Sequence, residues 1–222
     1  MKWLTVPLIT MILAACSPQE VNKIKPKLFH DYFTGLESQT VTDYNSIELD
    51  YDLSSRKGEN VHFSNCKQVE ATSDNDIAVS EYHLLTMIRI NCIALKKYSH
   101  AGNAHTSHLQ EILKNKDIRN LPATAYPYVN EYDKKSRLGK MLKEYHKKLD
   151  VSLADDGAIT VVTETDRLRY EVLATGDFNA DKIEDALIRI NWRVIDAFGK
   201  GFKLIMVTRK VADQGYEITE LN

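Results

Sequence analysis

The hydrophobic residues from Gly157 to the C-terminus recur at every second position, and this pattern most constrains the fold. In residues 168–174 and 186–194, apolar side chains stand at every second position, and most of the residues between them are charged or polar. Successive side chains of a strand point to opposite faces, so this period predicts strands that each bury one face. Glycines at 199, 201 and 215 mark turns between neighbouring runs. We therefore predict an antiparallel β-meander over residues 157–222.

The preceding part of the chain has the period of helices. Apolar residues in the segment 84–98 recur at steps of three and four behind Ser80, a plausible N-cap. Residues 134–149 are basic on one side and apolar on the other, which predicts an amphipathic helix. We expect an α+β fold with one domain at 26–222, in which a helical N-terminal half (26–150) packs on the C-terminal antiparallel β-meander.

The N-terminus has the pattern of an export signal. Lys2 precedes an apolar run of residues 3–15, which is too short to span a bilayer as a helix. The run ends in Leu13-Ala14-Ala15-Cys16, which resembles the lipobox of bacterial lipoproteins. The resemblance implies a signal peptide at 1–15, a lipid with palmitate-type acyl chains on Cys16, and a tether over 16–25. The alternative is an ordinary secretory signal with a chance cysteine at the cleavage site.

The expected location follows from the same segment. Ser17 after the lipidated cysteine resembles the outer-membrane sorting signal of bacteria with two membranes. We therefore expect a lipid-anchored protein of the cell envelope, at the outer membrane and facing the periplasm. An oxidising compartment favours disulfides, so Cys66 and Cys92 are predicted to pair. Two reduced, buried thiols are the alternative.

A short acidic loop is the candidate metal site. In the segment 176–188, counted from Asp177 as position 1, oxygen-bearing side chains stand at positions 1, 3, 5 and 9. A hard cation such as Ca²⁺ takes oxygen ligands, and a tight turn can direct alternate side chains inward. The loop resembles the calcium loops of FG-GAP and VCBS repeats and of dockerin-like modules. That resemblance implies Ca²⁺ as the cofactor, with a ligand set of Asp177, Asn179, Asp181, the Ile183 carbonyl and Asp185.

Two residues of this loop depart from the pattern. Lys182 stands where glycine is usual, and Ile188 replaces the bidentate glutamate of an EF-hand. The alternative is an acidic β-turn without an ion.

Composition and motifs constrain the function less. The net charge of −2 gives no support to a nucleic-acid partner, and no common nucleophile, zinc or phosphate-loop motif is present. Three histidines at 100, 105 and 108 lie in a polar segment that favours solvated side chains. We predict a non-catalytic binding or structural module that engages an envelope protein or polymer. The alternative is an envelope hydrolase acting on cell-wall or polysaccharide material through carboxylates such as Asp155, Asp156 and Glu164.

Overall fold

One antiparallel sheet forms the centre of the protein in the computed structural model, which describes residues 23–36, 41, 43–128 and 130–221. The strands follow each other in chain order across the sheet, and β1 pairs with β6 outside this path. The bounds are β1 Lys27–Leu28, β4 Asp150–Leu153, β5 Ile159–Val162, β6 Asp166–Gly176, β7 Asp185–Val194, β8 Lys200–Thr208 and β9 Glu217–Leu221. The predicted β-meander is therefore present, with β4 and β1 added to it.

The long strands β6 and β7 form the centre of the sheet. Their register pairs Leu168 with Trp192 and Tyr170 with Ile190, and shifts between Val172 and Ala174. Nearly all of their central residues are buried on both faces, because protein covers the sheet on each side.

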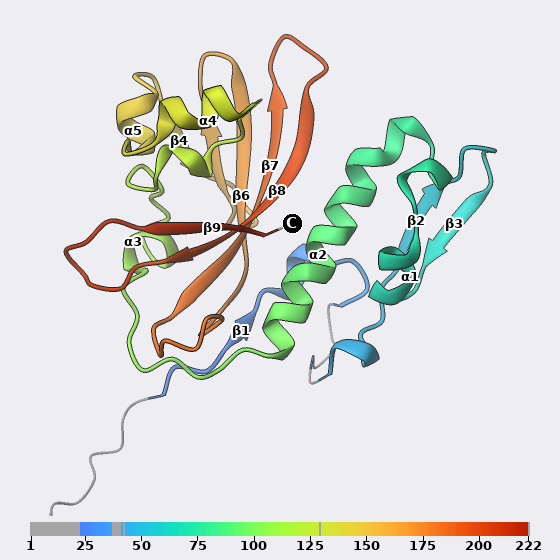
Figure 1. Cartoon of the computed structure of the whole chain (residues 1–222), viewed down its shortest axis with the longest axis horizontal. Coiled ribbons are helices and arrows are strands. Elements are labelled where there is room, and N and C mark those ends of the chain that lie inside the picture. The colour runs from blue at the N-terminus through green and yellow to red at the C-terminus, as the bar shows by residue number, and fades with distance from the viewer. Residues whose placement is uncertain (1–22, 37–40, 42, 129, 222) are drawn as a thin grey trace, which may run out of the picture.

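Two hydrophobic clusters lie on the two faces of this sheet. On one face, Leu173, Leu187 and Leu204 join the apolar residues of the N-terminal segment and the long helix α2 (Tyr82–Ser99). On the other face, strand residues pack with apolar side chains from the segment 109–142. Figure 1 shows α2 between the sheet and a small hairpin of β2 (Tyr51–Ser54) and β3 (Asn60–Phe63).

The helix α2 agrees with the predicted periodicity. Its buried residues include Leu85, Ile88, Cys92 and Leu95, which form one apolar face against the sheet and the hairpin. The helix begins after a 3-10 turn that contains Ser80, and its N-cap is Glu81. No described helix is apolar enough over a sufficient length to cross a lipid bilayer.

The remaining helices are short, so the predicted helical half is wrong. Strand accounts for 33% of the described residues against 28% for helix, and the fold is mostly β. The short α-helices are α1 Cys66–Ala71, α3 Gln110–Leu113, α4 Glu131–Arg137 and α5 Leu142–Tyr145. Single-turn 3-10 helices occur at His30–Tyr32, Tyr44–Ser46, Asp74–Asp76, Val79–Glu81 and Ala123–Ala125. Loop residues such as Ile118 and Leu121 supply much of the second cluster. This face of the sheet is therefore covered without a long amphipathic helix.

The predicted helix at 134–149 is interrupted for a specific reason. Gly139 has a φ of 73°, a left-handed conformation that ends α4 and reverses the chain. Leu138, expected on the buried side, is 61% exposed. The basic residues therefore belong to two short helices and to the segment that leads into β4.

Candidate functional site

The predicted anchor at Cys16 lies outside the described residues, so lipidation stays a prediction. The predicted cysteine pair is joined: the sulfur atoms of Cys66 and Cys92 are bonded, with 5.5 Å between the Cα atoms. This disulfide links the start of α1 to the middle of α2, and both residues are buried in the first hydrophobic cluster. Its location indicates a structural role.

The acidic loop connects β6 to β7, and hydrogen bonds fix its conformation. The two carboxylate oxygens of Asp177 accept the backbone N–H groups of Asp181 and Lys182, each at 3.1 Å. Asn179 Oδ1 also accepts the Asp181 N–H at 3.0 Å, and Asp181 Oδ1 accepts the Ile183 N–H at 2.8 Å. Lys182 has a φ of 69°, which is the strained conformation that glycine would otherwise adopt at this position.

Asp185 closes the base of the loop. Its carboxylate accepts the backbone N–H of Phe178 at 3.0 Å and the hydroxyl hydrogen of Thr208. Burial raises the pKa of Asp185 to about 6, and the negative charges of Asp181 and Asp177 add to this rise. Asp177 and Asp185 are buried and Asp181 is exposed. The carboxylate oxygens of these three residues do not all lie within 4.8 Å of one another, and Lys182 Nζ lies 3.6 Å from an Asp177 oxygen. The described loop therefore does not bring the predicted ligands together around one point.

A second acidic group was not singled out from the sequence. In the part of the chain that the structure describes, Asp50, Asp52 and His62 are the acidic or histidine residues whose ligand atoms all lie within 4.8 Å of one another. His62 Nδ1 lies 3.0 Å from Asp52 Oδ1, and hydrogen bonds from Asn60 and His62 lower the pKa of Asp52. The group is exposed, and the β2–β3 register that places Asp52 opposite His62 could have indicated it.

Two pockets flank the end of the β7–β8 hairpin. The first, which we name the aromatic cavity, has a volume of about 440 Å³ and is lined by Tyr126, Pro127, Tyr128, Arg137, Asp166, Leu168, Trp192, Val194 and Gly199. The second, which we name the cationic pocket, also has a volume of about 440 Å³ and is lined by Arg167, Arg193, Val194, Ile195, Phe198 and Lys200. Both volumes fall in the range of small-ligand sites.

The side chains of Tyr126, Tyr128 and Arg137 in the aromatic cavity are hydrogen-bonded within the protein. Arg137 makes a bidentate ion pair with Asp133, at 2.9 and 2.6 Å, and donates to the Tyr126 carbonyl at 2.9 Å. Its guanidinium also lies 5.1 Å from the centre of the Tyr126 ring. The Tyr126 hydroxyl donates to Asp166 at 2.5 Å, and the Tyr128 hydroxyl donates to Glu220 at 2.7 Å. Burial and the bond to Asp166 raise the pKa of Tyr126.

Trp192 lies across the neighbouring strand in the same cavity. Its register partner on β8 is Gly201, and a Cβ atom added there would lie only 3.0–3.1 Å from the indole. Glycine at 201 therefore provides the space that the indole ring occupies. This arrangement fixes the ring as part of the cavity wall.

The carboxylates that the hydrolase alternative would use lie at opposite ends of β5. Asp155 and Asp156 are in the turn before β5, and Glu164 is in the turn after it. A strand of four residues spans about 13 Å, more than the roughly 5–9.5 Å between the paired carboxylates of glycosidases. Asp156 pairs with Arg169, and Glu164 pairs with Lys148 at 2.7 Å, which lowers the pKa of Glu164. Asp156 and Glu164 are therefore used in surface ion pairs.

Comparisons with known proteins add no relative: no family model matches the chain, and no curated protein or solved structure matches it.

Proposed function

We propose that this chain is a lipid-anchored, non-catalytic binding protein of the cell envelope, and that its aromatic cavity holds a protein partner. The observation that carries the proposal is the closed set of hydrogen bonds around Tyr126, Tyr128 and Arg137. A group that performs acid–base chemistry needs a polar atom free to reach the substrate. Here the polar atoms hold the rings in place, which suits a preformed binding surface.

The residue types of the cavity favour a protein as the partner. Trp, Tyr and Arg are the residues that most often dominate the binding energy of protein interfaces, especially where they form a packed pocket. Trp192, two tyrosines and Arg137 meet in this one cavity. The predicted anchor at Cys16 would place the partner in the envelope, at the outer membrane and facing the periplasm in a bacterium with two membranes.

Site-specific crosslinking in cells tests the proposal. A photoreactive residue at Pro127, which lines the cavity, should give a discrete crosslinked protein, and the same residue at Tyr132 should not. Tyr132 is a matched control because it lies on α4 and is 85% exposed. Trp192→Ala should remove the crosslink, since loss of a dominant interface residue weakens binding by roughly 30-fold or more.

The same design separates the two candidate functions. A crosslink from Tyr132 equal to that from Pro127 would show that the cavity is not the binding site. Release of soluble fragments from cell-wall or polysaccharide material, lost in Asp156→Asn or Glu164→Gln, would establish the hydrolase instead.

We also propose that Ca²⁺ stabilises the β6–β7 loop through Asp177, Asn179, Asp181, Asp185 and the Ile183 carbonyl. The support is that the negative charges of Asp181 and Asp177 act on buried Asp185 and help to raise its pKa, a repulsion that a cation would relieve. With a Kd of about 0.1 mM, millimolar Ca²⁺ should stabilise the folded state by roughly 1.4 kcal/mol, which raises the Tm by about 3–5 °C.

Thermal unfolding in EDTA and in Ca²⁺ tests the loop. The Tm increase should disappear in Asp181→Ala and persist in Asp52→Ala, which removes a carboxylate from the exposed group on the β2–β3 hairpin. Mg²⁺ should have a smaller effect because it requires stricter octahedral geometry. An unchanged wild-type Tm in Ca²⁺ would show that the loop is an acidic turn without an ion.

A further inference from the structure

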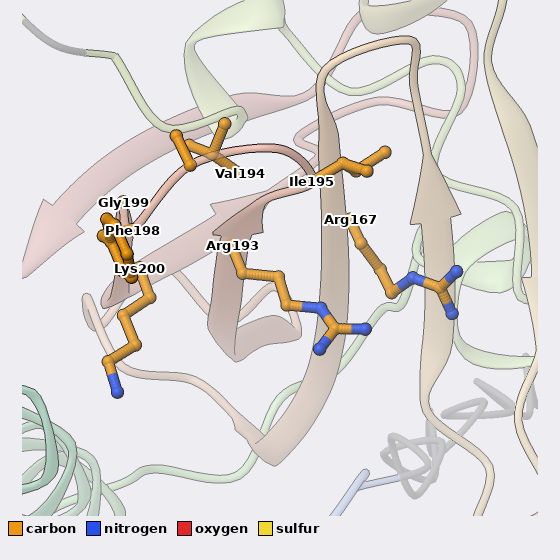
Figure 2. A pocket seen from close by; sticks show the side chains of 8 residues that line it. Arg167, Arg193, Val194, Ile195, Phe198, Gly199 and Lys200 are labelled. Atoms are coloured by element: carbon orange, nitrogen blue, oxygen red, sulfur yellow. The ribbon is translucent and has the colours of Figure 1, made fainter.

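Three positive side chains lie at one level across three neighbouring strands. Arg167 on β6 is the register partner of Arg193 on β7, and Arg193 is the register partner of Lys200 on β8. Directly opposed residues of antiparallel strands have Cα atoms about 4.5–5.5 Å apart and project to the same face. Figure 2 shows the long side chain of Arg193 between those of Lys200 and Arg167, all lining the cationic pocket.

None of the three has a side-chain ion pair or hydrogen bond to another described residue. The next arginines on the same face differ in this respect. Arg169 and Arg189 each donate to Glu171, at 2.7 Å, and Arg189 also donates to Asn91. The sheet thus neutralises its inner arginines and leaves the outer three cations without a partner.

Such an arrangement lowers the stability of the sheet. Like charges directly opposite each other on neighbouring strands are destabilising, and here the arrangement occurs twice in succession. The acidic residue of the connecting turn, Asp196, does not line the pocket. The positive charge of Lys200 also acts on His83 of α2, whose pKa is lowered mainly by burial and further by this lysine.

Exposed apolar side chains adjoin the cations. Phe198 and Ile195, in the turn between β7 and β8, line the same pocket and are 104% and 46% exposed. A fully exposed phenylalanine at a loop tip gains nothing from folding, and burying it against a ligand is worth a factor of about ten or more in affinity. The pocket therefore joins a cationic surface to an apolar one.

We propose that the cationic pocket binds a phosphate-bearing amphiphile, with the phosphate at Arg167, Arg193 and Lys200 and the apolar portion against Phe198 and Ile195. Guanidinium groups bind phosphate oxygens in a bidentate manner, and a lysine adds a compact charge. This site goes beyond the proposed protein partner, because Arg193 and Trp192 are consecutive residues of β7 and point to opposite faces of the sheet. The amphiphile is either a single molecule or part of an assembled lipid surface.

Calorimetric titration of the full chain tests the ligand chemistry. The soluble probes are inorganic phosphate and monomeric dihexanoyl phosphatidylglycerol. The matched control is monomeric dihexanoyl phosphatidylcholine, in which the choline cation balances the charge of the phosphate. The phosphatidylglycerol probe should bind at least tenfold more tightly than either of the others. Flotation with phosphatidylglycerol vesicles distinguishes the sources, with phosphatidylcholine vesicles as the control because a lipid on Cys16 would insert into both. Preferential binding to the phosphatidylglycerol vesicles without binding of the monomer assigns the ligand to a lipid surface.

Variants distinguish the role of each part of the pocket. Arg193→Gln should weaken binding of the anionic lipid at least tenfold, while removal of the like-charge pairs raises the Tm by about 1–3 °C. Phe198→Ala should weaken lipid binding and leave binding of inorganic phosphate unchanged. Lys57→Gln is the matched control, because Lys57 is an exposed cation in the β2–β3 turn.

The proposal would be overturned by an absence of binding to both the lipid monomer and the vesicles, by an Arg193→Gln variant that binds like the wild type, or by equal weakening in Lys57→Gln. Equal affinity for the two dihexanoyl lipids would likewise exclude recognition of the anionic phosphate.

Discussion

Loss of the Glu171 charge is expected to destabilise the protein more than loss of any single exposed charge. Glu171 is 6% exposed and lies between two arginines, with Nε atoms of Arg169 and Arg189 each 2.7 Å from one of its oxygens. Arg189 is itself buried, and Asn91 of α2 is its other partner. Glu171→Gln keeps the shape of the side chain and leaves a buried guanidinium without its counter-charge.

The cost can be estimated from this environment. Breaking a buried ion pair by removing one partner costs about 3–5 kcal/mol. The lower end applies here, because Arg169 is partly exposed and still pairs with Asp156. A loss of about 3 kcal/mol lowers the Tm of a chain of this length by roughly 6–12 °C. Thermal unfolding followed by circular dichroism measures the shift.

A matched control uses the same arginine. Asp156 pairs with Arg169 at the surface, where its side chain is 51% exposed, so Asp156→Asn should lower the Tm by no more than about 2 °C. The double variant Glu171→Leu, Arg189→Met should recover much of the loss, since apolar residues of similar volume often replace a buried ion pair without cost. Equal shifts for Glu171→Gln and Asp156→Asn would refute the reasoning.

Three further predictions concern the anchor, the disulfide and pH. Cys16→Ser should release the protein from the membrane fraction or leave it unprocessed, and full retention with normal processing, seen by fractionation and mass spectrometry, would exclude the lipid anchor. Cys66 and Cys92 should resist alkylation until reduced, and reduction should lower the Tm, because a loop of this length contributes about 3.5 kcal/mol in the chain-entropy description. Burial and the charge of Arg137 lower the pKa of His146 in the folded state, so its contribution to stability is complete above its unfolded pKa and is lost as pH falls through the folded value. His146→Phe should therefore show a smaller loss of Tm between pH 7 and pH 5 than the wild type, and an identical loss would exclude this histidine as the cause.

The sequence predicted those elements whose signal is local. Strands β6 and β7 alternate over about ten residues, and α2 repeats its apolar face for five turns, so each pattern is long enough to identify its structure. Strand β1 has two residues and pairs with β6, which is more than a hundred residues away in the chain. No local pattern could reveal such a pairing.

The failed prediction at 134–149 has a similar origin. The spacing of apolar and basic residues fits a helix, but the single glycine at 139 adopts a conformation that a helix cannot contain. Tertiary packing decides such a position, because Leu142 is buried in the second cluster while Leu138 is left exposed. The periodicity therefore indicated an amphipathic segment and could not indicate where the chain turns.

The two candidate pockets depend on register, which explains why the sequence did not reveal them. Arg167, Arg193 and Lys200 read as the solvated side of alternating strands until the pairing of β6, β7 and β8 places them at one level. The same register places Arg169 and Arg189 beside Glu171. The arginines paired with Glu171 then contribute to folding stability, and the unpaired Arg167 and Arg193 contribute to ligand binding. Stability and lipid affinity should therefore vary independently. Glu171→Gln should lower the Tm without changing the affinity for anionic lipid, whereas Arg193→Gln should weaken lipid binding and raise the Tm by about 1–3 °C.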